Sequence, residues 1–129
     1  MGTIVLDAGV VIGALDDADA HHAAAIASIA ARSDDDLRLP ASAYSEVLVV
    51  PARTGRFEEV RSDLAALSLG VDPIGAVAAE EAARLRARHP SLRLPDALVI
   101  AYAETVDADE LLTTDARWAR FSSRVQVVG

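Results

Sequence analysis

Four acidic residues stand where apolar segments of the chain begin or end. Asp7 and Asp115 each directly follow a short run of the kind that forms a buried strand. Asp96 and Glu46 each lie near the start of a segment of helical character. We name these four residues the acidic quartet. Carboxylates placed repeatedly at the edges of buried segments predict a shared pocket, and such a pocket is suited to a divalent metal ion.

The ligand chemistry of the acidic quartet favours a hard cation. The quartet offers only carboxylate oxygens, since it contains no histidine and the chain has no cysteine. Such ligands favour Mg²⁺ or Mn²⁺ over Zn²⁺. These ions bind phosphate oxygens, lower the pKa of a bound water molecule and stabilise a leaving oxygen. The pattern therefore indicates phosphodiester hydrolysis.

Each member of the quartet also has a simpler explanation. Asp7 fits a turn residue at a strand end, and Glu46 fits a solvated helix residue. Asp96 fits a first-turn acid that complements the helix dipole, and Asp115 fits the N-cap of a short helix. Taken singly, Glu46 and Asp96 are best explained in this way. The occurrence of all four acids together favours the metal site.

The composition restricts the classes of protein to which the chain can belong. With 129 residues, 52% of them apolar, the sequence predicts a single domain spanning residues 1–129. No apolar run approaches the roughly 20 residues of a membrane helix, and the N-terminus lacks the basic start of a signal peptide. We therefore expect a cytoplasmic protein that does not enter the membrane. The chain has no lysine, which excludes a P-loop.

The net charge of −8 argues against a general nucleic-acid binder. Two explanations stay open: nucleic acid is not the partner, or the acidity serves a metal pocket and a basic protein partner. One basic cluster fits either a solvated helix face or a track for phosphate groups, and two arginines near Asp115 are alternative phosphate contacts. The cluster is Arg84, Arg86, Arg88 and Arg93, and the other two are Arg117 and Arg120.

The order of the segments predicts an α/β fold, in which a parallel sheet of four to five strands carries helices on both faces. The expected strands are 2–7, 37–39, 71–74, 110–114 and 124–128. The expected helices are 8–16, 20–32, 42–50, 57–68, 75–89, 95–106 and 115–121. Ser42 is the expected N-cap of its helix. Helix 20–32 is expected to bury an apolar stripe made of Ala24, Ile26, Ala27, Ile29 and Ala30.

Four segments, in this order, resemble those of PIN-domain ribonucleases, specifically the VapC-type toxins of bacterial toxin–antitoxin pairs. They are Ile4–Ile12, Ser42–Leu48, Leu94–Ala101 and Leu112–Asp115. Each segment alone is weak, but the four in order cover nearly the whole chain. The resemblance implies a single PIN-like domain.

The resemblance also implies roles for individual residues. It implies that Asp7, Glu46, Asp96 and Asp115 form a metal-binding quartet, in which Glu46 binds the ion or positions water. It also implies that a threonine before the last acid, Thr113 or Thr114, supports the site by hydrogen bonding.

The chain departs from the family pattern at two positions. Family members often carry Ser or Thr where this chain has Gly9, and a further acid can stand where it has Arg117. Gly9 removes one hydroxyl from the surroundings of the site. Arg117 favours one tightly held ion over a rich two-metal site. Arg93 and Arg117 are the expected contacts to substrate phosphates.

The activity implied by the resemblance is RNA cleavage dependent on Mg²⁺ or Mn²⁺, which inhibits translation and is neutralised by a cognate antitoxin with a basic C-terminal segment. The implied assembly is a homodimer that forms a heterotetramer or a larger complex with the antitoxin. The segment 44–67 would form part of the antitoxin groove and of the dimer contact. Two other functions stay open: a catalytically silent PIN-like module that binds RNA or protein, and a metal-dependent DNA nuclease on the same scaffold.

Overall fold

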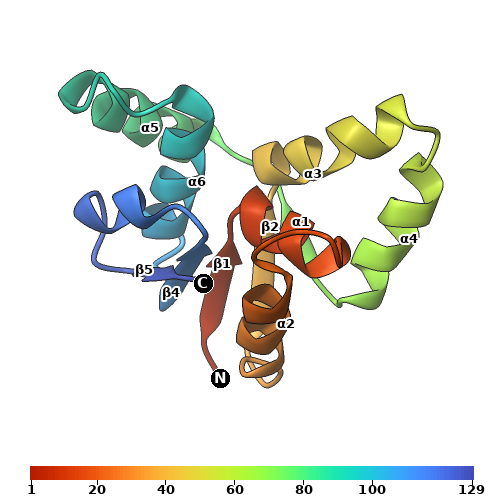
Figure 1. Ribbon diagram of the computed structural model, residues 1–129. Helices are drawn as coiled ribbons and strands as arrows, with labels where there is room; N and C mark the ends of the chain where they lie inside the picture. The colour runs from red at the N-terminus through yellow and green to blue at the C-terminus, as the bar shows by residue number, and fades with distance from the viewer.

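Five parallel strands form one sheet at the centre of the computed structural model, which describes residues 1–129 (Figure 1). The strands are β1 (Thr3–Leu6), β2 (Asp36–Pro40), β3 (Gly70–Asp72), β4 (Glu110–Thr113) and β5 (Val125–Val127). Their order in the sheet is β3-β2-β1-β4-β5, with every pair parallel. In the central pair, Leu6 lies opposite Leu112, so β1 and β4 end at the same edge. The predicted α/β fold with a parallel sheet is confirmed.

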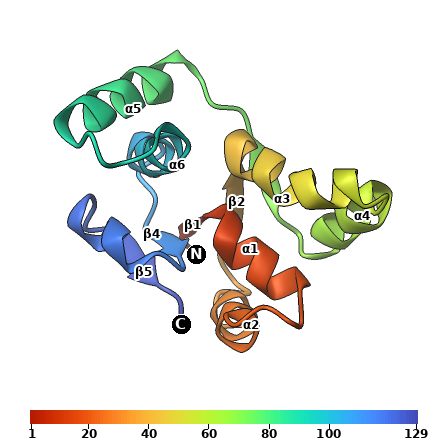
Figure 2. The ribbon, with the colours of Figure 1, turned by 45° about the horizontal axis from the view of Figure 1, so that its top comes forward.

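Six α-helices and one 3-10 helix connect the strands. They are α1 (Ala8–Leu15), α2 (His22–Ala30), α3 (Ala41–Arg53), α4 (Phe57–Ala66), α5 (Ala76–Arg88), α6 (Leu94–Thr105) and the 3-10 helix η1 (Ala116–Arg120). The pair α5 and α6 lies on one side of the sheet, whereas α1 and α2 lie on the other (Figures 1 and 2). No helix is long and apolar enough to cross a membrane.

The path of the chain places the topological switch point of the sheet between β1 and β4. From β1 the chain moves outward to β2 and β3 through α1–α4, then returns past β1 to β4 through α5 and α6. The direction of strand addition therefore reverses between β1 and β4. In open α/β sheets, ligands bind outside the carboxyl ends of the strands at such a reversal.

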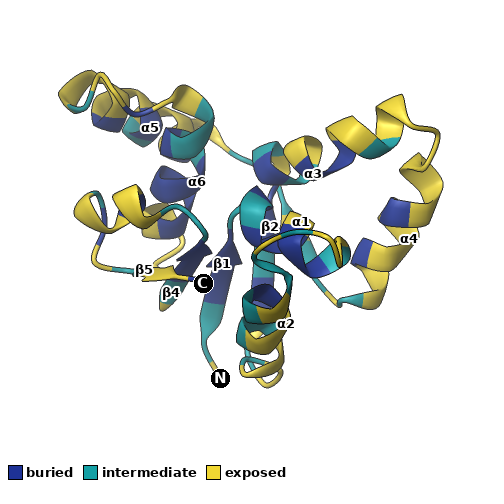
Figure 3. Ribbon diagram, in the orientation of Figure 1, coloured by how far each residue is buried: buried dark blue, intermediate teal, exposed yellow.

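The core is built on the two central strands. Ile4, Val5 and Leu6 of β1 and Leu111 and Leu112 of β4 are at most 1% exposed. Figure 3 shows buried residues concentrated in these strands and in α6, while the outer turns of α4 and α5 are exposed. Removal of this apolar surface from water is the main force that fixes β1 and β4 side by side.

Helix α2 packs through only part of the predicted apolar stripe. Ala24 and Ile29 pack against the core beside the buried Ala25. Ile26 is 43% exposed, and Ala27 and Ala30 are also exposed. The reason lies in α1: an added Cβ at Gly13 would lie 3.5 Å from the Ala25 methyl carbon, so the two helices meet at these small residues. A close contact between small side chains, not the widest apolar stripe, sets the rotation of α2.

The start of α3 also differs from the prediction. The helix begins at Ala41 after Pro40, and Ser42 lies inside it, where its buried Oγ has no hydrogen-bond partner. The helix continues through Pro51 to Arg53 and ends before Gly55, whose φ is +75°. Glycine tolerates this left-handed conformation, so the chain turns there into α4.

Candidate acidic active site

The acidic quartet comes from four elements that meet near the carboxyl ends of β1 and β4. Asp7 follows β1 and caps α1, and Asp115 follows β4 and caps η1. Asp96 lies in the first turn of α6, and Glu46 lies in the second turn of α3. Charge repulsion links Asp7 to both Asp96 and Glu46, and links Asp96 to Asp115. The fold thus brings together the four acids that the sequence singled out.

Asp7 is the most constrained member of the quartet. Its Oδ1 accepts a hydrogen bond from the Ala8 backbone N–H at 2.8 Å, and its Oδ2 accepts one from the Thr113 hydroxyl at 3.1 Å. Burial raises its pKa from 3.8 to about 6, and repulsion from Asp96 and Glu46 adds to the shift, against the effect of the two hydrogen bonds. The site therefore holds a carboxylate whose ionisation is opposed by its surroundings.

Of the two threonines that the resemblance assigned to the site, only Thr113 forms side-chain hydrogen bonds, one of them to Asp7. Thr113 is fully buried, and its hydroxyl oxygen also accepts a hydrogen bond from the Asp115 N–H at 3.1 Å. Thr114 lies against α1: a Cβ added at Gly9 would lie 2.7 Å from the Thr114 Oγ1. The Thr114 hydroxyl thus takes the space beside Asp7 that a side chain at position 9 would need. This packing has no periodic signal in the sequence and was not foreseen.

Glu46 and Asp96 share the electrostatic character of Asp7. The pKa of each is raised, chiefly by burial. Repulsion from Asp96 raises the pKa of Glu46 further, while the Arg93 guanidinium lowers the pKa of both carboxyls. Arg93 forms no direct ion pair in the structure, so it moderates the charge of the site without neutralising either acid.

Asp115 differs from the other three acids because it is paired with Arg117. The Arg117 Nε donates to Oδ1 at 3.0 Å, and Nη2 donates to Oδ2 at 2.7 Å. The Arg117 backbone N–H also donates to Oδ1 at 3.0 Å, which is the N-cap bond of η1. The side-chain hydrogen bonds from Arg117 are the main reason that the pKa of Asp115 is lowered.

A small cavity of about 90 Å³ adjoins Asp96 and Asp115. Three arginines line it: Arg93, Arg117 and Arg120. The buried Trp118 also lines the cavity. The cavity brings together arginines that are far apart in the sequence, whereas Arg84 pairs with Glu81 on the exposed surface of α5 at 2.8 Å.

The chemistry of the donor set fits a hard divalent cation. All four side chains offer carboxylate oxygens, three of them have raised pKa values, and a cation would relieve the repulsion between them. No three Asp, Glu or His side chains are placed to ligate one ion at the same time. Both carboxylate oxygens of Asp115 accept hydrogen bonds from the Arg117 side chain, so this ion pair would have to open before Asp115 could ligate an ion.

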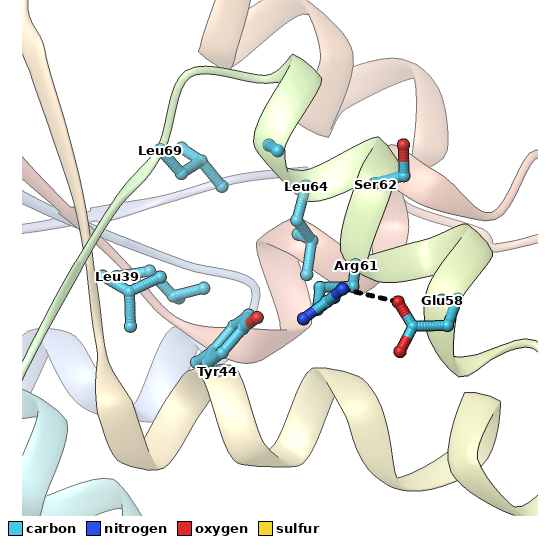
Figure 4. Close-up of a pocket in the computed structure, with 9 residues that line it drawn as sticks. Leu39, Tyr44, Glu58, Arg61, Ser62, Leu64 and Leu69 are labelled. Carbon is cyan, nitrogen blue, oxygen red and sulfur yellow. Dashed lines mark hydrogen bonds and ion pairs between the residues drawn. The ribbon is translucent and has the colours of Figure 1, made fainter.

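A second, larger cavity lies away from the acids. It has a volume of about 480 Å³ and lies between β2, α3, α4 and β3. Figure 4 shows Leu39, Tyr44 and Leu64 around it, with the ion pair of Arg61 and Glu58 at one side. This lining contains no cluster of acids and is suited to apolar contacts, so it does not compete with the acidic quartet as the centre of phosphodiester chemistry.

Comparison with known proteins identifies the family. The model of the PIN domain matches residues 4–123. A chain of a toxin–antitoxin complex from Klebsiella pneumoniae is 22% identical, with 96% of each chain covered and a TM-score of 0.77. A chain of VapBC2 from Rickettsia felis, bound to a promoter DNA fragment, is 13% identical, with 98% of this chain and 99% of that chain covered and a TM-score of 0.78.

A third solved structure has the same fold. VapC20 from Mycobacterium tuberculosis, a sarcin–ricin loop cleaving toxin, is 15% identical, with 92% of this chain and 95% of that chain covered and a TM-score of 0.78. No curated protein sequence matches the chain significantly. Since the family model spans all four acids and nearly the whole sheet, the chain belongs to the PIN domain family.

Proposed function

We propose that this protein is a metal-dependent endoribonuclease that acts as the toxin of a VapBC-type toxin–antitoxin pair. The observation that carries the proposal is the convergence of four carboxylates from four elements, three of them with raised pKa values. Burial is the main cause of these raised pKa values and repulsion adds to it, so the arrangement costs stability and is best explained by a bound cation. The solved structures that share the fold include toxins and toxin–antitoxin complexes, which supports the biological role.

The residues of the site have distinct parts in this proposal. Asp7, Asp96 and Asp115 hold Mg²⁺ or Mn²⁺, and Glu46 completes the ligand set or orients the attacking water. When bound, the ion supplies Lewis-acid chemistry at the phosphodiester. Thr113 fixes Asp7 through the hydrogen bond to its Oδ2.

Arginines and the second threonine support the reaction from the edge of the site. Arg93 and Arg117 bind phosphate groups of RNA, since the guanidinium fork matches phosphate oxygens. Thr114 packs over Gly9, between the start of α1 and the turn that carries Asp115. In-line attack by water leaves a 5′-phosphate and a 3′-hydroxyl. Cleavage of an RNA that takes part in translation would inhibit protein synthesis in the cytoplasm.

The antitoxin partner is supported by an apolar surface with acidic neighbours. Ile12, Val50 and Val60 line a hollow between α1, α3 and α4, and Val50 is 61% exposed. Asp16 and Asp63 lie at the same hollow. An amphipathic segment with basic residues suits this surface, and a homodimer that joins two such complexes is the proposed assembly.

The test is cleavage of matched RNA and DNA oligomers by purified protein with Mg²⁺ or Mn²⁺. Asp7→Asn and Asp96→Asn should each lower the RNA cleavage rate by about 100-fold or more, because each removes a charged ligand. The matched control is Asp34→Asn, which neutralises an exposed acid in the turn before β2, at the opposite edge of the sheet.

The outcomes separate the candidate functions. Equal cleavage by all variants would overturn the assignment of the acids. Cleavage of the DNA oligomer in preference to the RNA oligomer would favour a DNA nuclease on the same scaffold. Absence of both metal binding and cleavage would favour a silent binding module.

A further inference from the structure

Arg117 occupies both oxygens of one member of the acidic quartet. Its guanidinium makes two hydrogen bonds to Asp115, at 3.0 and 2.7 Å, in the fork geometry that arginine forms with a carboxylate. Asp7, Glu46 and Asp96 take part in no ion pair. The structure therefore neutralises one acid of the quartet and leaves the other three to repel one another.

The pair of Arg117 and Asp115 is placed so that it can open. The Arg117 side chain is 78% exposed, whereas the Asp115 side chain is 26% exposed. Exposed ion pairs stabilise proteins weakly, by no more than about fivefold in an equilibrium constant. Release of the side-chain pair leaves the backbone N–H bond from Arg117 to Asp115 in place, so η1 keeps its cap.

A cavity that suits a phosphate group lies beside the pair of Arg117 and Asp115. Arg93, Arg117 and Arg120 line one small cavity together with Asp96 and Asp115. Arg120 lies with its Cζ 5.4 Å from the centroid of the Phe121 ring, so it is held by a cation–π contact and not by an acid. A phosphate group in this cavity would meet three guanidinium groups, and it has the oxygen geometry that the arginine fork binds.

We propose that Arg117 exchanges Asp115 for a phosphate group of RNA, and that this exchange couples RNA binding to metal binding at the acidic quartet. After the exchange, the Asp115 carboxylate is no longer paired with Arg117 and is free to bind the metal ion. Because RNA and metal each favour the opened pair, each raises the affinity of the protein for the other. The inference rests on the proposed function, since it requires a metal at the quartet.

The test measures Mn²⁺ binding by electron paramagnetic resonance, with and without a short phosphorothioate RNA that is cleaved slowly. In the wild type, RNA should tighten Mn²⁺ binding by about threefold to tenfold. Arg117→Gln should bind Mn²⁺ about fivefold more tightly without RNA, and RNA should then add little. Arg117→Lys, which keeps the charge but lacks the fork, should fall between the two.

Arg120→Gln is the matched control. It removes one positive charge from the same cavity but leaves Asp115 paired, so coupling between RNA and Mn²⁺ should persist. Identical Mn²⁺ affinity and identical coupling in Arg117→Gln and Arg120→Gln would overturn the exchange, because charge alone would then explain the effect. Absence of Mn²⁺ binding in the wild type would overturn the metal site of the proposed function as well, so the two failures are distinguishable.

Discussion

Thr113, at the end of β4, donates its hydroxyl hydrogen to Asp7, which follows the neighbouring strand β1, across 3.1 Å. The same hydroxyl oxygen accepts the backbone N–H of Asp115 at 3.1 Å. One fully buried side chain thus fixes two members of the acidic quartet relative to each other. The separation of these two acids depends on a hydrogen bond as well as on the sheet.

Thr113→Val should destabilise the protein by about 1 to 2 kcal/mol. Valine keeps the shape of threonine but leaves the Asp115 N–H and Asp7 Oδ2 without this partner, and an unpaired buried polar group costs about this much. Loss of the bond should also raise the pKa of Asp7 further, since the Thr113 hydroxyl lowers it. Urea unfolding measures the stability.

Thr105→Val is the control for the substitution itself. The Thr105 hydroxyl donates to the Ala101 carbonyl of its own helix at 2.8 Å, away from the acids. We expect a change within about 0.5 kcal/mol, as for most surface substitutions. Equal losses in the two variants would contradict a special role for the Thr113 bond.

Asp7→Asn should make the metal-free protein more stable at neutral pH but not in acid. The folded pKa of Asp7 lies at about 6, above its ordinary value of 3.8, so the folded state binds the proton more tightly than the unfolded state. The stability linked to this proton is fully present below about pH 4 and is lost as the pH rises through 6. At one pKa unit per 1.36 kcal/mol, Asp7→Asn should gain roughly 1 to 3 kcal/mol at pH 7.

The comparison is made in a metal chelator by urea unfolding at pH 4 and pH 7. Asparagine can still cap α1, so the change isolates the charge. Asp34→Asn, at an exposed turn, should show no such difference between the two pH values. A constant difference between Asp7→Asn and the wild type across this range would argue that the Asp7 pKa is not raised.

Gly9→Ala should be less stable than Gly13→Ala by about 1 to 2 kcal/mol, although both lie in α1. Replacement of a helical glycine by alanine usually gains about 0.5 to 1 kcal/mol. An added Cβ meets only ordinary contacts at Gly13, at 3.5 Å, but lies 2.7 Å from the Thr114 Oγ1 at Gly9. Thermal unfolding of the two variants measures the difference.

Removal of the opposing hydroxyl provides the control for this contact. In a Thr114→Ala background, Gly9→Ala should become stabilising, because the obstructing atom is absent. The double-mutant cycle gives the coupling free energy between the two positions. A coupling near zero would show that Thr114 moves aside freely.

Ser42→Ala should stabilise the protein by about 1 kcal/mol. The buried Ser42 Oγ has no hydrogen-bond partner, and the burial of an unsatisfied hydroxyl costs about 1 to 3 kcal/mol. Ser45→Ala, on an exposed position of the same helix, is the matched control and should change little. A loss of stability in Ser42→Ala would mean that the hydroxyl has a partner in solution.

The sequence alone was sufficient for the local elements and for the residue types of the site. Short apolar runs predicted the central strands β1 and β4, because parallel strands that are buried on both faces must be apolar on both faces. The edge strands β3 and β5 were also predicted, but they are more exposed. The helices were predicted within a few residues, since the proline and glycine positions limit where each can run. The absence of cysteine and the four acids directed the prediction to oxygen-ligated Mg²⁺ or Mn²⁺.

Relations between distant residues were decided by the tertiary structure. The stripe predicted for α2 was wrong at Ile26, Ala27 and Ala30, which are exposed because Gly13 and Ala25 set the helix rotation. This contact has no counterpart in the periodicity of either segment. Ser42 was wrongly predicted as an N-cap because Pro40 already has the extended conformation that precedes the helix.

The same limit applies to the site. The sequence contains Asp7, Thr113, Asp115 and Arg117, but it does not contain the distances among them. Pairing of β1 with β4 places Thr113 against Asp7, and the turn into η1 directs Arg117 back onto Asp115. The sequence states the chemistry of each residue directly. The distances between the acids and their partners arise only when strands that are about 100 residues apart in sequence pack side by side.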